Sequence, residues 1–215
     1  MTVAAMRPQL TEVDIRRLVK GESAEERASV AHRLCRRIAF DVLTDEEQLH
    51  ASEIMNILAS DMAELVRRTL SVTLRNSPRL TRDLAMKLAH DVETVALPIL
   101  EESPSLTEED LIELALSVTA TKQAGIAARP RVPSSVTEVL TAHGSVEANR
   151  ILAGNEGAEW TDVAFGHSVQ RFGTDTDFQD ALVRRDYIPM HIAEKLVSLV
   201  SGSIFDMLVN RHELP

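Results

Sequence analysis

The sequence predicts an all-α protein, an α-solenoid of about five short two-helix units with an N-terminal helical cap. Three observations lead to this expectation. Aromatic residues make up only 3% of the 215 residues, which favours helices packed through aliphatic side chains over a β-sandwich. Only eight glycines occur, too few for many tight hairpin turns. The third observation is a repeat with a period in the high twenties.

The repeat is found by aligning the residue that precedes each helix-start signal. These residues, the anchors, are bulky and apolar and lie 26, 26, 28 and 28 residues apart: Leu80, Leu106, Val132, Trp160 and Ile188. A Thr or a Pro follows each anchor, and both residues commonly start helices. Eight positions beyond four of the anchors, two turns along the same helical face, stand Leu88, Leu114, Leu140 and Leu196, with Ser168 in the remaining unit. A helix is therefore expected after each anchor, with Pro133 and Pro189 at the first helical position.

A second apolar series precedes the anchors and predicts a shorter helix in each unit: Leu74, Leu100, Ile126, Leu152 and Leu182. N-caps for these shorter helices are expected at Asp91, Thr119, Ser145 and Thr174. Pro98 is expected to kink or break its helix. Each unit thus consists of a short helix, a tight corner and a longer helix. Two helices of about ten residues cannot bury both apolar faces alone, so neighbouring units are expected to stabilise each other.

Four segments are expected along the chain. They are a flexible N-terminus at 1–10, an N-terminal helical cap with the first repeat helix at 11–79, the repeat array at 80–202, and a C-terminal helix or tail at 203–215. Within the cap, Ser23 with Glu26, and Thr44 with Glu47, have the spacing of helix-capping pairs.

Charge and cysteine content exclude several classes of protein. The net charge of −10 makes nucleic acid an unfavoured partner. Cys35 is the only cysteine, so one chain can form neither a disulfide nor a thiolate zinc cluster. The first residues lack the apolar core of a signal peptide, and no run of eighteen apolar residues occurs. We therefore expect a cytoplasmic protein without a membrane span.

Several stretches together resemble a family of uncharacterised, mostly alphaproteobacterial proteins, domain-of-unknown-function family two-three-three-six. The most specific are "VALPILEESPSLTEEDL" at 95–111, "AARPRVPSSVTEVL" at 127–140 and "GSVEANRILAGNEGA" at 144–158. The resemblance extends from about Thr11 to Leu199 and implies short HEAT-like helical repeats and a bacterial context. The family brings no assigned activity. Its members are often longer than this chain, which leaves open a further C-terminal region.

No catalytic, metal or cofactor site is expected, because the sequence lacks G-x-S-x-G, P-loop and G-x-G-x-x-G motifs. Glu47 and His50 have the i, i+3 spacing of a di-iron ligand pair, but no second E-x-x-H occurs. They are therefore interpreted as surface polar residues. Cys35, beside Arg36 and Arg37, is interpreted as a small buried residue rather than a reactive thiol.

The expected function is a non-catalytic scaffold or adaptor, because the longer helices of a solenoid form a wall of side chains that can bind a protein or peptide. Candidate partner-binding residues on this wall are Arg82, Lys87, Glu109, Glu113, Glu138, His167, His191 and Lys195. The alternative is a nucleic-acid-binding or repair-type enzyme on a HEAT-like scaffold, which the acidic charge and the single tryptophan disfavour.

Arginines at the corners allow two interpretations. Arg129 and Arg185 each lie three residues before an anchor, where a cation can bond to carbonyls at the C-terminus of the short helix. Alternatively, these two arginines with Arg131 and Arg184 bind an anion or an acidic peptide. Trp160 is expected to pack in the core, as the other anchors do.

The last segment is apolar on much of its circumference and includes Ile204, Phe205 and Leu208. A helix that caps a solenoid usually has a polar outer face. We therefore expect these three residues to form an oligomer contact, such as a homodimer through this helix. Packing over the last unit is the alternative.

Overall fold

The protein is described here by a computed structural model, which covers residues 10–20, 23–200 and 202–211. Apart from Leu10, the expected flexible segment 1–10 lies outside these residues. The described residues form α-helices joined by loops, with one isolated β-bridge, so the expectation of an all-α fold is confirmed. None of the helices in these ranges is long and apolar enough to cross a lipid bilayer. The chain divides into two compact units: unit 1 comprises residues 1–99 and 103–105, and unit 2 comprises residues 100–102 and 106–215.

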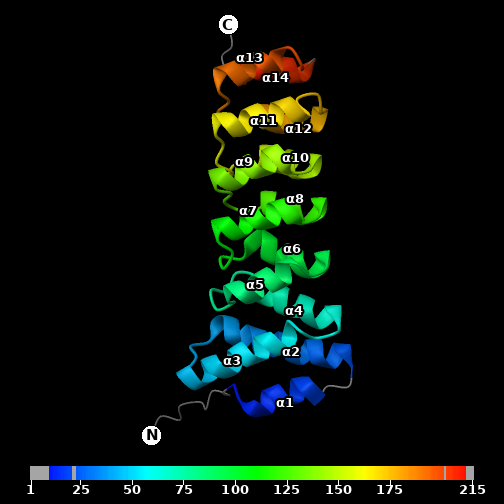
Figure 1. Ribbon diagram of the computed structural model, residues 1–215, viewed down its shortest axis with the longest axis vertical. Helices are drawn as coiled ribbons and strands as arrows, with labels where there is room; N and C mark the ends of the chain where they lie inside the picture. The colour runs from blue at the N-terminus through cyan, green and yellow to red at the C-terminus, as the bar shows by residue number, and fades with distance from the viewer. Residues whose placement is uncertain (1–9, 21–22, 201, 212–215) are drawn as a thin grey trace. The chain divides into compact units, whose positions relative to one another are not determined.

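The helices, labelled as in Figure 1, are α1 (Glu12–Lys20), α2 (Ala24–Phe40), α3 (Asp45–Leu58), α4 (Glu64–Leu74), α5 (Arg82–Ala89), α6 (Glu93–Glu102), α7 (Glu108–Ser117), α8 (Ala120–Ala127), α9 (Ser134–His143), α10 (Val146–Gly154), α11 (Asp162–Phe172), α12 (Thr176–Val183), α13 (Met190–Val197) and α14 (Ser203–Arg211).

In unit 1, α2 packs along α4, while α1 contacts both α2 and α3. Ser23 caps α2 by accepting from the N–H of Glu26 at 3.1 Å. Thr44 and Glu47 form the expected capping box at the start of α3. The Glu47 carboxylate accepts from the N–H groups of Thr44 at 2.9 Å and Leu10 at 3.2 Å. Glu47 is therefore buried, and its interpretation as a surface residue is wrong.

In unit 2 the helices follow one another in two rows (Figure 1). α7, α9, α11 and α13 form one row, in which each helix contacts the next, and α8, α10 and α12 form the other. The last helix, α14, contacts α12 and α13. The apolar positions of the aligned sequence lie inside these contacts: Leu106, Val132, Ile188, Leu114, Leu140, Leu196, Ile126, Leu152 and Leu182 are all buried. Trp160 differs from the other anchors, because it is only half-buried.

Most helix-start signals act as expected. Thr107 and Asp110 form a complete capping box, and Ser145 accepts from the N–H of Ala148 at 3.2 Å. Two expected N-caps are wrong by one residue. Asp175 rather than Thr174 caps α12, because its carboxylate accepts from the N–H of Phe178 at 2.8 Å. Val92 rather than Asp91 is the N-cap of α6.

The prolines differ from expectation in two ways. Pro133 and Pro189 are the N-cap residues, so α9 and α13 begin one residue later than predicted. α6 runs through Pro98, so of the expected kink or break the break does not occur, although the proline has no N–H to donate to the preceding turn. Helix lengths also differ from the predicted short–long alternation, since α12 and α13 both have 8 residues.

One close contact joins consecutive corners, the loops between the two helices of each pair. Val132 and Ala158 form the isolated parallel bridge, with the Val132 N–H donating to the Gly157 carbonyl at 3.0 Å. A Cβ on Gly157 would collide with the carbonyl oxygen of Pro130. Glycine is therefore required at this position, because only it lets the two loops approach.

Candidate functional site

The corner arginines bond to helix ends that lie one pair earlier in the chain. Arg129 donates to the carbonyl of Leu100 in α6 at 2.6 Å. Arg185 donates to the carbonyls of Ala153 at 3.2 Å, Asn155 at 2.8 Å and Ala158 at 3.1 Å. Burial lowers the pKa of both guanidinium groups. This arrangement corresponds to the first of the two interpretations, with the addition that each bond joins consecutive helix pairs.

Asn155 occupies a comparable place between these arginines. Its side-chain amide donates to the carbonyls of Ala127, the last residue of α8, and Arg129, both at 2.8 Å. Three corners of unit 2 thus carry a side chain that satisfies C-terminal carbonyls of the preceding pair.

The four candidate arginines do not converge on one place. Arg131 is at the surface and pairs with Glu159 at 2.8 Å. Arg184 pairs with Asp180 one turn earlier on α12, at 2.9 Å. Arg184 and Arg185 share a cavity that neither Arg129 nor Arg131 lines.

That cavity, the tryptophan pocket, has a volume of about 600 Å³. It is lined by Ala153, Gly154, Glu156, Trp160, Phe165, Asp180, Ala181, Arg184, Arg185, Asp186 and Tyr187. The rings of Trp160 and Phe165 have centroids 4.8 Å apart, and the Arg185 guanidinium lies 5.3 Å from the Trp160 centroid. Sequence reasoning missed this pocket, although Tyr187 directly precedes Ile188, the anchor that follows Trp160.

A second cavity, the α11–α13 groove, has a volume of about 670 Å³. It is lined by Val163, Gly166, His167, Val169, Gln170, Gly173, Thr174, Lys195, Ser198 and Leu199. Two candidate partner-binding residues, His167 and Lys195, therefore meet here. Nδ1 of His167 is buried and has no hydrogen-bond partner among the described residues. A Cβ on Gly166 would meet nothing within 4 Å, so the groove is open at that position.

The remaining candidates on the predicted wall lie outside both cavities. Glu109 and Glu113 are exposed on α7, and His191 is exposed on α13. Glu138 on α9 accepts from the Thr161 hydroxyl at 2.6 Å. Arg82 and Lys87 lie on α5 in unit 1 and are exposed.

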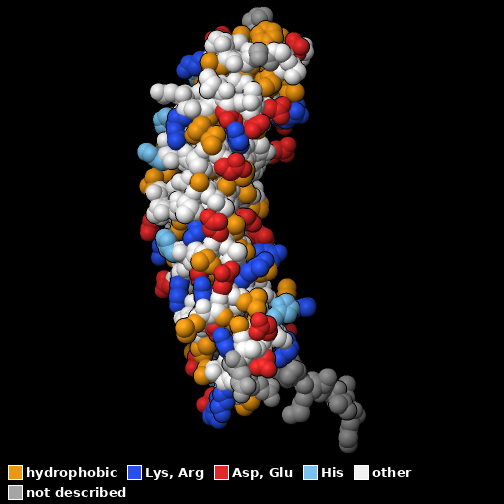
Figure 2. Space-filling model, turned by 90° about the vertical axis from the view of Figure 1, so that its right-hand side faces the viewer, with side chains coloured by type: hydrophobic (Ala, Val, Ile, Leu, Met, Phe, Trp, Pro, Cys, Tyr) orange, Lys and Arg blue, Asp and Glu red, His pale blue; other side chains and the backbone are white. Residues whose placement is uncertain are grey.

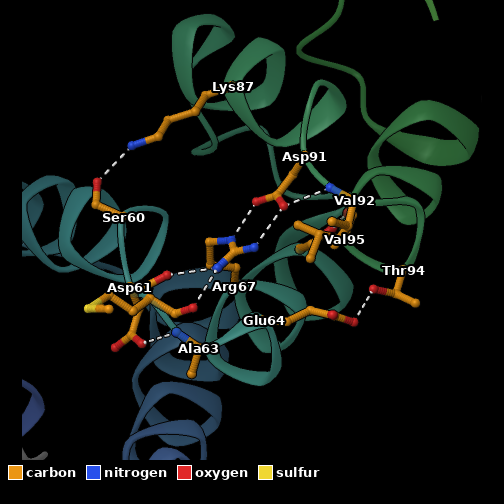
Figure 3. Close-up of polar contacts among 12 residues, drawn as sticks. Ser60, Asp61, Ala63, Glu64, Arg67, Lys87, Asp91, Val92, Thr94 and Val95 are labelled. Carbon is orange, nitrogen blue, oxygen red and sulfur yellow. Dashed lines mark hydrogen bonds and ion pairs between the residues drawn. The ribbon is translucent and has the colours of Figure 1, made fainter.

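Around Lys87, unit 1 carries a polar network (Figure 3). Lys87 donates to the Ser60 hydroxyl at 2.7 Å. Arg67 makes a two-pronged pair with Asp91 at 2.5 and 2.8 Å and donates to the Asp61 carbonyl at 2.9 Å. The carboxylate of Asp61 pairs with Arg27 at 2.8 and 3.0 Å, and this bonding lowers the pKa of Asp61. Arg67 and Asp61 bond to residues of neighbouring helices and loops, so we interpret the network as stabilising the fold.

The described residues contain no group of three or more His, Cys, Asp or Glu side chains that could hold a metal ion. Cys35 is buried, and this burial raises the pKa of its thiol to about 12. A thiol with such a pKa is not a nucleophile at neutral pH.

The residues expected to form an oligomer contact have different surroundings. Leu208 is fully buried in a core that includes Phe178. Ile204 packs partly against the same core, whereas Phe205 is 38% exposed. α14 thus packs over α12 and α13, and Phe205 is the most exposed of the three residues.

The acidic charge is concentrated in unit 2. Residues 101–215 contain 18 Asp and Glu against 9 Lys and Arg, a formal charge of −9 out of −10 for the whole chain. On the face drawn in Figure 2, the basic side chains are interspersed with acidic ones. Neither observation indicates a surface suited to a nucleic-acid backbone.

Comparison with protein-family models matches residues 95–215 to DUF2336, described as an uncharacterised protein conserved in bacteria. No curated protein matches the chain. No solved structure matches it either.

Proposed function

The chain belongs to the DUF2336 family of uncharacterised bacterial proteins, which supplies no activity to start from. From the surface of the structure, we propose that the protein is a non-catalytic α-solenoid scaffold. It binds a protein or peptide segment through unit 2. Fold alone does not assign an activity, so the proposal depends on particular cavities and side chains.

The solenoid part of the proposal is supported by how consecutive pairs meet. Helices of 8 to 11 residues in unit 2 are too short to be stable alone. Each one contacts the next helix of its row, and Arg129, Asn155 and Arg185 bond backward to the preceding pair. Such nearest-neighbour burial is how helical repeats gain stability.

The α11–α13 groove is the observation that carries the scaffold proposal. Its apolar lining includes Val163 and Leu199, both substantially exposed, beside the cationic Lys195. Exposed apolar side chains next to a few polar groups in a concave surface are typical of protein-binding grooves. The groove lies between two helices of the proposed wall, where an extended or helical segment could contact both.

Gly166 permits a direct test. Gly166→Leu adds a bulky side chain where the groove is open, whereas Gly166→Ala adds one methyl group and serves as the matched control. Both changes replace a helical glycine and favour the helix. The immobilised chain is used to capture proteins from bacterial extract, and the captured proteins are quantified for each variant.

We expect that some of the proteins captured by the wild-type chain are no longer captured by Gly166→Leu or by Lys195→Glu, and that both variants lose the same proteins. Gly166→Ala should still capture them. Identical captured sets for all variants would contradict the proposal. Tight, steeply salt-dependent binding of duplex DNA by the purified chain would instead favour the nucleic-acid alternative.

A further inference from the structure

We propose that the tryptophan pocket binds an arginine or lysine side chain of a basic partner segment. The inference rests on the proposed scaffold function and adds the chemistry of the partner. It concerns a different cavity from the α11–α13 groove.

Aromatic side chains are unusually concentrated in this pocket. The chain has one Trp, one Tyr and five Phe, and three of these seven residues line it: Trp160, Phe165 and Tyr187. Tyr187 is 70% exposed, so much of its ring is available to a partner. Trp and Tyr in a concave surface are the residue types that most often dominate binding energy.

The two arginines that line the pocket already make hydrogen bonds within the protein. Arg185 donates to three backbone carbonyls and lies over the Trp160 ring. Arg184 donates to both carboxylate oxygens of Asp180, at 3.0 and 2.9 Å. Arg184 is therefore neutralised by a carboxylate, and both Nη groups of Arg185 are occupied by carbonyls, so the two arginines do not present a free fork of donors to an anion.

The lining of the pocket is acidic on balance, because it holds three carboxylates, Glu156, Asp180 and Asp186, against the two guanidinium groups. Glu156 is exposed and makes no hydrogen bond or ion pair within the described part of the chain, although its charge attracts the Arg185 guanidinium and opposes the burial that lowers the pKa of that group. The Asp186 side chain is 94% exposed and accepts from Arg211 at 2.8 Å. The charge of −9 on unit 2 adds a longer-range field that attracts basic partners.

A guanidinium or ammonium group suits this combination of rings and carboxylates. It can lie over the Tyr187 ring in a cation–π contact and pair with Glu156. The methylene stem of the same side chain can cover the apolar surface of Ala153 and Ala181. A glutamate or aspartate side chain would meet repulsion from the same carboxylates.

The only tryptophan of the chain reports on the pocket directly. Trp160 fluorescence is followed while a peptide with one central Arg between alanines, acetylated and amidated, is added at constant ionic strength. The same peptide with Lys, Gln or Glu at the central position is titrated in parallel. We expect a saturable change with Arg and Lys and none with Gln and Glu. A saturable change with the Glu peptide would overturn the inference, and so would the absence of a saturable change with all four peptides.

Variants locate the binding. Tyr187→Ala should weaken binding of the Arg peptide about tenfold, the usual worth of one partly desolvated cation–π contact. Tyr187→Phe keeps the ring and should keep the affinity, and Glu156→Gln should weaken it. Glu159→Gln, an exposed carboxylate outside the pocket, is the control. An unchanged affinity of Tyr187→Ala would overturn the inference, and circular dichroism checks that each variant is folded.

The titration and the capture experiment can fail separately. Loss of captured proteins with Gly166→Leu tests the groove and the scaffold function, whatever the Arg peptide does. Conversely, the Arg peptide can bind the pocket even when the groove captures no partner.

Discussion

Arg150 in α10 and Asp175 at the start of α12 form a two-pronged ion pair, with Nε–Oδ1 and Nη2–Oδ2 distances of 2.9 and 2.6 Å. Arg67 and Asp91 make the same kind of pair between α4 and the start of α6 (Figure 3). In both cases the arginine of one helix reaches the beginning of the next helix but one. These pairs make the contact between neighbouring helices depend on ionised carboxylates.

Stability should therefore fall in acid. Arg150 lowers the pKa of Asp175, and Arg27 lowers that of Asp61. A carboxyl whose folded pKa lies below its unfolded value of about 3.9 stabilises the protein above that pH and loses this contribution as pH falls through the folded pKa. Urea unfolding between pH 7 and pH 3 should show smaller acid destabilisation for Asp175→Asn than for the wild type. Equal losses in both proteins would contradict this prediction.

Core substitutions in unit 2 should be costly. Leu114 and Ile126 are fully buried. Leu114→Ala and Ile126→Ala should each lower the free energy of unfolding by about 2–5 kcal/mol, because a cavity replaces apolar contacts. Leu116→Ala is the matched control, because Leu116 is exposed on the same helix as Leu114, and its change should be within about 0.5 kcal/mol. Chemical denaturation measures all three, and similar losses at Leu114 and Leu116 would refute the assignment of the core.

The corner arginines should differ sharply in their contribution to stability. Arg129 is buried and bonded to the Leu100 carbonyl, whereas the side chain of Arg131 is 80% exposed. Arg129→Met should destabilise the chain by about 1–3 kcal/mol, because a buried carbonyl loses its donor. Arg131→Met should cost less than about 1 kcal/mol, as is usual for a surface ion pair. Equal effects in urea unfolding would show that the buried bond does not stabilise the corner.

Much of the helical framework could be predicted from the sequence, because burial and helix capping depend on local pattern. The anchors Leu106 and Val132 and the capping box of Thr107 are examples. Trp160 was placed only in part: it packs against the core as expected, but it is less buried than the other anchors because it lines the pocket formed with a later corner. The burial of Glu47 depends on Leu10, 37 residues away, and no spacing rule indicates that contact.

The sites were less predictable than the fold. His167 and Lys195 were candidates by helical position, but their shared groove depends on the contact between α11 and α13. The arginines at the corners allowed either bonding to helix carbonyls or an anion site, and Arg129 and Arg185 bond to carbonyls about one period earlier. The concentration of acidic charge in residues 101–215 requires counting alone, but it does not locate a site within them.

Self-association should depend on Phe205. The residue is 38% exposed on α14, next to Ile204, which is partly buried. Sedimentation equilibrium over rising concentration should show dimer formation by the wild type and a weaker tendency in Phe205→Asp, because a charge opposes burial in an apolar contact. Val146→Asp is the control, with 39% exposure on α10. A wild type that stays monomeric at all concentrations would rule out this contact.

Hydrogen exchange tests most directly whether each helix pair is stabilised mainly by its neighbours. Leu196 is fully buried in α13, and Leu196→Ala removes packing from the core that α13 shares with α12 and α14 at this end of unit 2. In a nearest-neighbour array, protection should fall most in α13, α14 and α11 and little in α7 and α8. An equal loss of protection from α7 to α14 would indicate one indivisible core and would contradict the solenoid proposal.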